Sequence, residues 1–156
     1  MVAVAAEVEA LAPMELKPLV SSAERPLRIL VAEDNRVNQR LACVILEKKG
    51  WTVEIARDGL EAISKLRQSR FDLVLMDVHM PELDGISATI RIRAGGDNTP
   101  ILALTASAMG GDAERCLEAG MNGYVAKPFR AEDLCQAVEQ AIGRCSLESP
   151  ARAVVL

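Results

Sequence analysis

The sequence contains few aromatic residues and little histidine, and it has no long hydrophobic run. Its 156 residues include one Trp, one Tyr, two Phe and one His. No apolar stretch approaches the roughly 18 residues that a membrane-spanning helix needs. The N-terminus carries no basic segment and reaches Glu7 early, so we expect no signal peptide. We therefore expect a cytoplasmic location, with no membrane attachment through this segment.

A large excess of charge and a cysteine framework are also missing. The formal net charge is −4 and the isoelectric point is near 5.1, which argues against general binding of nucleic acid or anionic membrane. The four cysteines show no CxxC motif and no metal-ligand spacing, and we expect reduced thiols at Cys43, Cys116, Cys135 and Cys145.

Five short apolar segments alternate with helical patterns along most of the chain. The strands are expected at residues 28–32, 51–55, 73–76, 100–104 and 122–126. A helical pattern follows each strand. The first has Val37, Leu41, Val44, Ile45 and Lys48 at helical spacing, and the last has Leu134, Val138, Ala141 and Ile142 facing inward. This alternation predicts an α/β fold with a parallel sheet and helices on both faces.

Reactive side chains stand at the ends of four of these strands. The first strand ends at Glu33 and Asp34, the third at Asp77, the fourth at Thr105 and the fifth at Lys127. Each has an ordinary explanation alone, such as a helix cap or a surface cation. The carboxyl ends of parallel strands meet at one edge, however, where such sheets bind ligands. Three clustered carboxylates favour a hard cation, Mg²⁺ or Mn²⁺, and a carboxylate can accept a phosphoryl group.

These motifs together resemble the receiver domain of two-component response regulators. The segments that carry the resemblance are ILVAEDN (29–35), LMDVHMP (75–81), DG (84–85), LTA (104–106) and YVAKPF (124–129). The similarity covers residues 27–143. We expect a linker or N-terminal arm at residues 1–26, which could include a short helix near residues 5–11, and a C-terminal tail at residues 144–156.

The resemblance implies a flavodoxin-like (βα)5 three-layer sandwich with strand order 2-1-3-4-5. It implies that Asp77 accepts phosphate from the phosphohistidine of a sensor histidine kinase or of a histidine phosphotransfer domain. Glu33, Asp34, Asp77 and the backbone carbonyl of His79 would serve the metal. Thr105 and Lys127 would assist catalysis, and Thr105 and Tyr124 would act as the switch.

Further expectations concern the switch and the surroundings of the domain. We expect a cis peptide bond at Lys127-Pro128, a movable helix after Gly110-Gly111, and a homodimer surface formed by the fourth helix, fifth strand and fifth helix. The run EDNRVNQ (33–39) resembles receivers of hybrid sensor histidine kinases. The receiver itself would catalyse only its own phosphorylation and dephosphorylation, and histidine kinase activity would require the rest of a hybrid kinase.

Two other functions remain open from the residues alone. A magnesium-dependent phosphohydrolase with an aspartate nucleophile would carry a second acid two residues later, where this chain has His79. A flavodoxin-like nucleotide or flavin binder would need a phosphate-cradling loop after the first strand, where this chain has Glu33 and Asp34. The single His79 could also suggest a phosphorelay histidine, but its place beside Asp77 favours a position on the rim of the site.

Overall fold

The computed structural model describes residues 25–106 and 111–155 of the chain. It contains a parallel sheet in the order β2-β1-β3-β4-β5. The helix expected near residues 5–11 and Gly110 lie outside the described residues. The strands are β1 (Arg28–Ala32), β2 (Thr52–Ala56), β3 (Leu73–Asp77), β4 (Ile101–Thr105) and β5 (Gly123–Ala126); the helices are α2 (Arg36–Lys48), α3 (Gly59–Gln68), α4 (Gly85–Ala94), α5 (Asp112–Ala119) and α6 (Ala131–Val155).

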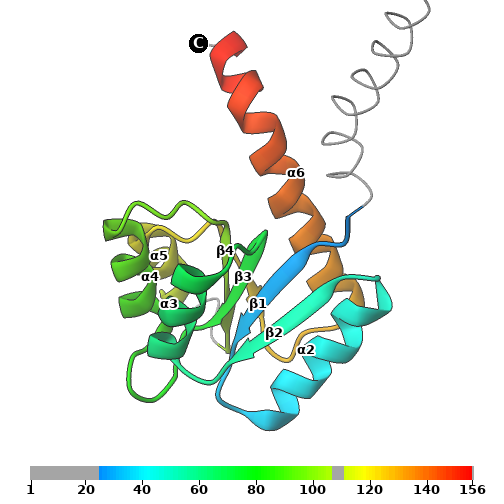
Figure 1. Cartoon of the computed structure of the whole chain (residues 1–156), viewed down its shortest axis with the longest axis vertical. Helices are drawn as coiled ribbons and strands as arrows, with labels where there is room; N and C mark the ends of the chain where they lie inside the picture. The colour runs from blue at the N-terminus through cyan, green and yellow to red at the C-terminus, as the bar shows by residue number, and fades with distance from the viewer. Residues whose placement is uncertain (1–24, 107–110, 156) are drawn as a thin grey trace, which may run out of the picture.

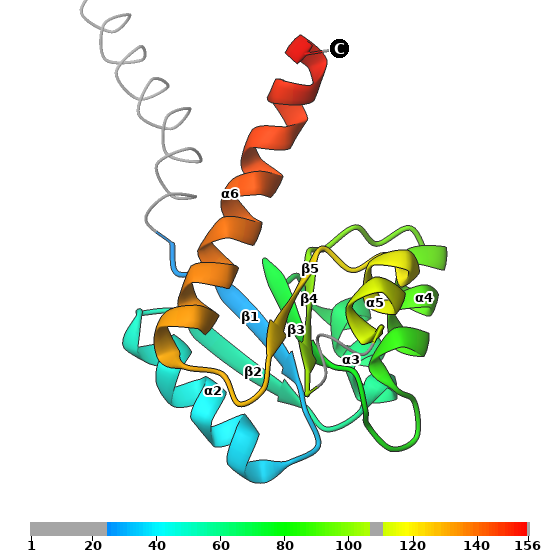
Figure 2. The ribbon, with the colours of Figure 1, turned by 180° about the vertical axis from the view of Figure 1, so that it is seen from behind.

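The helices cover both faces of the sheet, so the molecule has three layers (Figures 1 and 2). Helices α2 and α6 pack on one face, and α3, α4 and α5 pack on the other. Side chains of a strand alternate between the two faces: in β3, Leu73 and Leu75 join the first core, whereas Val74 and Met76 join the second. The strand order and the layers confirm the predicted flavodoxin-like fold.

The central strand β3 is buried along its whole length, which explains its uninterrupted apolar sequence. It lies between β1 and β4, and its last residue, Asp77, pairs in register with Leu104. The edge strand β2 is more exposed, in agreement with its alternating sequence. The burial of β3 therefore places a carboxylate at the middle of the carboxyl edge of the sheet.

Three of the helices begin with a side-chain cap. Asn35, Asp58 and Asp84 each accept a hydrogen bond from the backbone N–H three residues later. Such caps satisfy N–H groups that have no partner inside the helix. Two of the caps, Asn35 and Asp84, lie in loops that follow β1 and β3, so the same short segments end a strand, carry the site and start a helix.

Helix α2 buries a different face from the one that its apolar spacing emphasised. Its buried residues are Ala42, Ile45 and Leu46. Val37, Leu41 and Val44 lie in solvent, with exposed fractions of 74%, 40% and 51%. The face that carries Ala42, Ile45 and Leu46 packs in the core, and the stripe of Val37, Leu41 and Val44 remains outside.

Helix α6 also differs from the expectation. It continues to Val155, beyond residue 143, where the sequence placed the start of a tail (Figure 1). Leu147, Glu148 and Ala151 have high helix propensity, so the helical backbone continues past Gly143. The inward-facing residues of its first part are as predicted, since Leu134, Val138 and Ala141 are buried.

Candidate functional site

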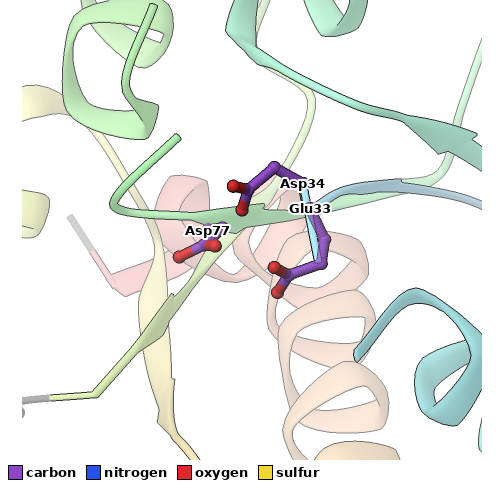
Figure 3. Close-up of side chains that lie close together, drawn as sticks. All are labelled: Glu33, Asp34 and Asp77. Carbon is purple, nitrogen blue, oxygen red and sulfur yellow. The ribbon is translucent and has the colours of Figure 1, made fainter. Parts of the chain in front are cut away.

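The carboxyl edge of the sheet brings the predicted acids together. Glu33 and Asp34 follow β1, and Asp77 is the last residue of β3. Figure 3 shows the three side chains side by side, from two neighbouring strands. One carboxylate oxygen of each lies within 4.8 Å of those of the other two. Glu33 and Asp77 are 1% and 4% exposed, whereas Asp34 is exposed to solvent. The cluster is therefore open on one side, at Asp34.

Lys127 supplies the cation of the site. Its Nζ atom lies 3.0 Å from Oε1 of Glu33 and 3.0 Å from Oδ2 of Asp77. Burial alone would lower the pKa of Lys127, but its bonds and charge interactions with Asp77 and Glu33 outweigh burial and raise that pKa. The ammonium therefore stays charged at neutral pH and balances part of the negative charge of the cluster.

The Glu33 carboxylate has partners on two sides, but one of its oxygens lacks a hydrogen bond. Its Oε2 accepts a hydrogen bond from the N–H of Asn35 at 3.1 Å. Its Oε1 is buried, and no hydrogen bond of ordinary geometry reaches it from the described residues, although the Lys127 ammonium is in ion-pair contact. Burial raises the pKa of Glu33, partly offset by Lys127 and reinforced by the charge of Asp77.

This donor set fits a magnesium ion. Three carboxylates face one another with only one ammonium among them, and one of their oxygens is buried without a hydrogen bond. Magnesium prefers one or two carboxylates together with water molecules, and it disfavours closed protein cages. Exposed Asp34 and nearly buried Asp77 would supply direct ligands, while buried Glu33 would act through water.

The loop after β3 closes the other side of Asp77. The N–H of His79 donates to Oδ1 of Asp77 at 3.2 Å. The His79 side chain points away from this bond into solvent, 73% exposed, and its Nε2 atom lies 3.6 Å from Oδ2 of Asp112. His79 therefore lies on the rim of the site, as predicted, and both Asp77 oxygens have a partner.

Thr105 and Tyr124 lie on the two strands beside the site. Thr105 ends β4 and is fully buried. Its carbonyl accepts the N–H of Lys127 at 2.8 Å, so backbone pairing of β4 and β5 brings these two residues together. Tyr124 pairs in register with Ala103 and is 46% exposed. The peptide bond Lys127-Pro128 is cis, as expected.

Two residues of the site region were not identified from the sequence. The Gln39 amide donates to the carbonyl of Glu33 at 2.6 Å and ties α2 to the acidic turn. Asp112 contacts His79 from the start of α5. Gln39 is one turn after the helix cap Asn35, a spacing that suggests such a contact, whereas Asp112 carried no signal beyond a first-turn acid.

One surface groove lies away from these charged side chains. It has a volume of about 600 Å³ and lies between α4 and α5, with Ile86, Ile90 and Arg115 among its lining residues. It includes none of the residues at the strand ends. Within the part of the chain that the structure describes, no helix combines the length and hydrophobicity needed to cross a membrane.

Comparison with characterised proteins agrees with the fold and the motifs. Residues 29–139 match the family model described as response regulator receiver domain. The transcription factor SKN7 of Saccharomyces cerevisiae is 46% identical over 106 residues, covering 68% of this chain and 17% of that protein. Hybrid signal transduction histidine kinase I of Dictyostelium discoideum is 40% identical over 126 residues, covering 75% of this chain and 7% of that protein. The chain thus spans only a small part of these relatives.

Solved structures are similar as well. The receiver domain of sensor histidine kinase PA1611 from Pseudomonas aeruginosa is 45% identical, with a TM-score of 0.71 over 76% of this chain and 98% of that one; its structure has a magnesium ion coordinated in the active site cleft. The receiver domain of Ssk1 from Saccharomyces cerevisiae, solved with the histidine phosphotransfer protein Ypd1, is 28% identical, with a TM-score of 0.71 over 76% of this chain and 90% of that one. The family match covers most of the chain and the fold agrees, so this chain belongs to the response regulator receiver domain family of two-component phosphorelay systems.

Proposed function

We propose that Asp77 accepts a phosphoryl group from a phosphohistidine donor, in a site that uses Mg²⁺. The observation that carries this proposal is the surroundings of Asp77: a nearly buried carboxylate at the end of the central strand, with an ammonium 3.0 Å from one oxygen and two further carboxylates alongside. A low-exposure carboxylate among fixed charges is pre-organised for nucleophilic attack on phosphorus.

The transfer balances without any further reactant. A carboxylate oxygen of Asp77 forms the new bond to phosphorus, the bond between phosphorus and the donor's imidazole nitrogen breaks, and its electron pair returns to that nitrogen. Lys127 would then hold an oxygen of the transferred group, since its ammonium is already beside Asp77. When bound through Asp34, Asp77, the His79 carbonyl and, by water, Glu33, magnesium would supply positive charge toward the phosphoryl oxygens.

Phosphorylation would switch Thr105 and Tyr124. A phosphoryl group on Asp77 would attract the Thr105 hydroxyl by a charge-assisted hydrogen bond. Thr105 is fully buried, so its movement must be compensated by its neighbours, whereas half-exposed Tyr124 on the adjacent strand has room to turn. The α5-β5-α6 surface would change with it, and this is the surface that we propose for homodimer formation.

The exposed stripe on α2 is our candidate docking surface for the phosphohistidine donor. Val37, Leu41 and Val44 repeat at helical spacing and stay in solvent. The stripe begins just after Asp34 and Asn35, at the open side of the acidic cluster. A partner helix that packs on it would lie beside Asp77. The Ypd1–Ssk1 complex shows that a related receiver pairs with a histidine phosphotransfer protein.

The two competing functions are not favoured. The position two residues after Asp77 is His79, whose imidazole turns toward α5, so it does not supply the second acid of a phosphohydrolase. The turn after β1 carries Glu33 and Asp34, which would repel the phosphate of a nucleotide or flavin. The curated relatives include hybrid histidine kinases, and we propose that this chain is the receiver part of such a protein.

A transfer assay tests the proposal. A histidine phosphotransfer protein labelled with ³²P on its histidine is mixed with the chain and Mg²⁺. Label should move to wild type and not to Asp77→Asn. Leu41→Glu should slow transfer, whereas Leu117→Glu, a matched change at an exposed leucine of α5, should not. Equal labelling of Asp77→Asn would refute the phosphoacceptor, and equal slowing by both leucine variants would refute the docking surface.

A further inference from the structure

His79 joins the phosphorylation site to helix α5 through two contacts of one residue. Its N–H donates to Oδ1 of Asp77 at 3.2 Å. Its imidazole Nε2 lies 3.6 Å from Oδ2 of Asp112, the first residue of α5. The path from the carboxylate of Asp77 to the start of α5 therefore consists of a single residue. It runs on the opposite side of Asp77 from Lys127, which contacts Oδ2.

Asp112 is placed to hold its partner. Its side chain is only 14% exposed, although the imidazole that it contacts is 73% exposed. It also contacts Arg115 in the same helix, whose Nη1 lies 3.3 Å from Oδ1 of Asp112. One carboxylate oxygen thus faces the helix and the other faces His79. Asp112 is consequently the more buried member of the pair, and its carboxylate can orient the exposed imidazole.

The start of α5 depends on such outside contacts. Its N-cap is Gly111, in the left-handed region with φ of 87°, and it makes no side-chain cap hydrogen bond. Helices α2, α3 and α4 each begin with a side-chain cap, whereas α5 has none and is anchored through its buried residues Ala113 and Cys116. A contact at Asp112 can therefore influence the position of this helix more than it would influence a firmly capped one.

We propose that Asp112 is a positioning residue for the phosphorylation site. It holds the His79 imidazole and thereby orients the His79 main chain against Asp77. The same pair reports the occupancy of Asp77 to α5, independently of Thr105 and Tyr124. A phosphoryl group changes the charge beside the His79 N–H, the loop adjusts, and the imidazole moves relative to Asp112. This inference rests on the proposed function, since it requires that Asp77 be the phosphoacceptor.

A double-mutant cycle on the full chain tests the pairing. The probe is beryllium fluoride with Mg²⁺, which mimics a phosphoryl group on a carboxylate, and its affinity is measured by calorimetry. His79→Ala and Asp112→Ala should each weaken binding by about two- to fivefold, the range for an ion-pair contact in which one partner, here the imidazole, is exposed. The double variant should bind beryllium fluoride no more weakly than the single variant of lower affinity does, because both substitutions remove the same contact.

Three further measurements make the test specific. Arg115→Ala removes the other partner of Asp112 and should leave affinity within about twofold of wild type. Asp112→Glu should restore part of the affinity lost in Asp112→Ala. Amide chemical shifts of α5 should respond to beryllium fluoride in wild type and respond less in Asp112→Ala, which a merely structural role would not produce if the fold is unchanged.

Each outcome has a definite meaning. The positioning role would be overturned if the fold-losses in affinity of the two single variants multiply in the double variant. It would also be overturned if Arg115→Ala loses as much affinity as Asp112→Ala. Either result would leave the proposed function intact. If wild type binds no beryllium fluoride with Mg²⁺, the proposed function fails and this inference fails with it. Coupled losses together with reduced α5 shifts are the result that we expect.

Discussion

Gly85, the first residue of α4, packs directly against the main-chain carbonyl of Asp77. A Cβ atom at residue 85 would collide with that carbonyl oxygen and would lie 2.9 Å from Cγ of Met76. The N–H of Gly85 donates to the carbonyl of Val78 at 2.9 Å, so the loop after β3 closes on its own first residue. Asp77, the proposed phosphoacceptor, is therefore packed through its main chain against a glycine eight residues later.

Gly85→Ala should consequently destabilise the protein and disturb the site. The added methyl group meets main-chain atoms that cannot move freely, and overpacking of this kind costs about 1–3 kcal/mol. The free energy of unfolding is measured with urea, and phosphorylation of Asp77 with a small phosphodonor. The control is Gly143→Ala, at a helical glycine with open space around its Cα, which should raise stability by about 0.5–1 kcal/mol. Unchanged stability of Gly85→Ala would contradict the close packing.

Glu33→Gln should stabilise the metal-free protein at neutral pH. Burial raises the pKa of Glu33, so the folded state binds this proton more tightly than the unfolded state does. Protonation of Glu33 therefore adds to the free energy of unfolding. This contribution is fully present below the ordinary pKa of 4.5, and it is lost as the pH rises through the higher pKa of the folded state. Glu33→Gln carries no charge at residue 33, so at pH 7 its free energy of unfolding should exceed that of wild type. This difference should shrink as pH falls toward 4.5.

Urea unfolding of wild type and Glu33→Gln between pH 4 and pH 8 measures this effect. Glu47→Gln, at an exposed position of α2, is the control and should follow wild type. Added Mg²⁺ should stabilise wild type more than Glu33→Gln, because the substitution weakens the water-mediated ligand that we propose at residue 33. A variant that is less stable than wild type at pH 7 would show that the Lys127 ion pair outweighs the burial of Glu33.

Asp34→Asn should weaken magnesium binding at least about tenfold, since few other carboxylates remain to hold an ion that gives up its water reluctantly. Calorimetry is the suitable measurement. Trp51 precedes β2, at the opposite end of the sheet from Asp34, so its fluorescence is a poor reporter of the site. Asp133→Asn, an exposed residue in the first turn of α6, should bind magnesium as wild type does. Equal affinity of both variants would remove Asp34 from the metal site.

Asp72→Asn should destabilise the end of the sheet opposite Asp77, where β3 begins, and the size of this effect should depend on pH. Asp72 accepts two bonds from Arg25 at 3.0 Å and one from the N–H of Arg28 at 2.7 Å. Burial raises its pKa, but the bonds and charges of Arg25 and Arg28 outweigh burial and lower that pKa. Its contribution, of about 1 kcal/mol, is therefore present above the ordinary pKa and lost as pH falls through the lower folded value.

Urea unfolding at pH 7 and at pH 3 checks this assignment. The difference between Asp72→Asn and wild type should be large at pH 7 and small at pH 3. Phosphorylation of Asp77 should be unaffected, because Asp72 precedes β3 and Asp77 ends it. A difference that grows on acidification would mean that the Arg25 and Arg28 contacts do not stabilise the charged form.

The strand ends could be predicted from the sequence because their signals are local. Apolar runs mark the strands, and parallel strands in one sheet present their carboxyl ends at one edge, so Glu33, Asp34 and Asp77 had to lie close together. The buried face of α2 could not be predicted in the same way. Apolar spacing shows that a helix is amphipathic, but it does not show whether the stripe meets the sheet or a partner.

Contacts between segments that are distant along the chain could not be predicted from the sequence either. Asp112 and His79 are joined only when α5 and the loop after β3 have been placed, and an acid in the first turn of a helix has an ordinary explanation. The length of α6 depends on weak propensities that a sequence pattern does not resolve. The grouping of Glu33, Asp34, Asp77 and Lys127 was therefore predictable from the sequence, whereas the contacts around this group required the fold.

Intact mass spectrometry after incubation with acetyl phosphate and Mg²⁺ tests the central claim most directly. Wild type should gain one phosphoryl group, about 80 Da, on the carboxylate of Asp77. The gain should be absent when Mg²⁺ is removed with a chelator and absent in Asp77→Asn, while Asp72→Asn should be labelled as wild type is. The same gain in Asp77→Asn, or a gain in wild type that does not require a divalent cation, would contradict the account.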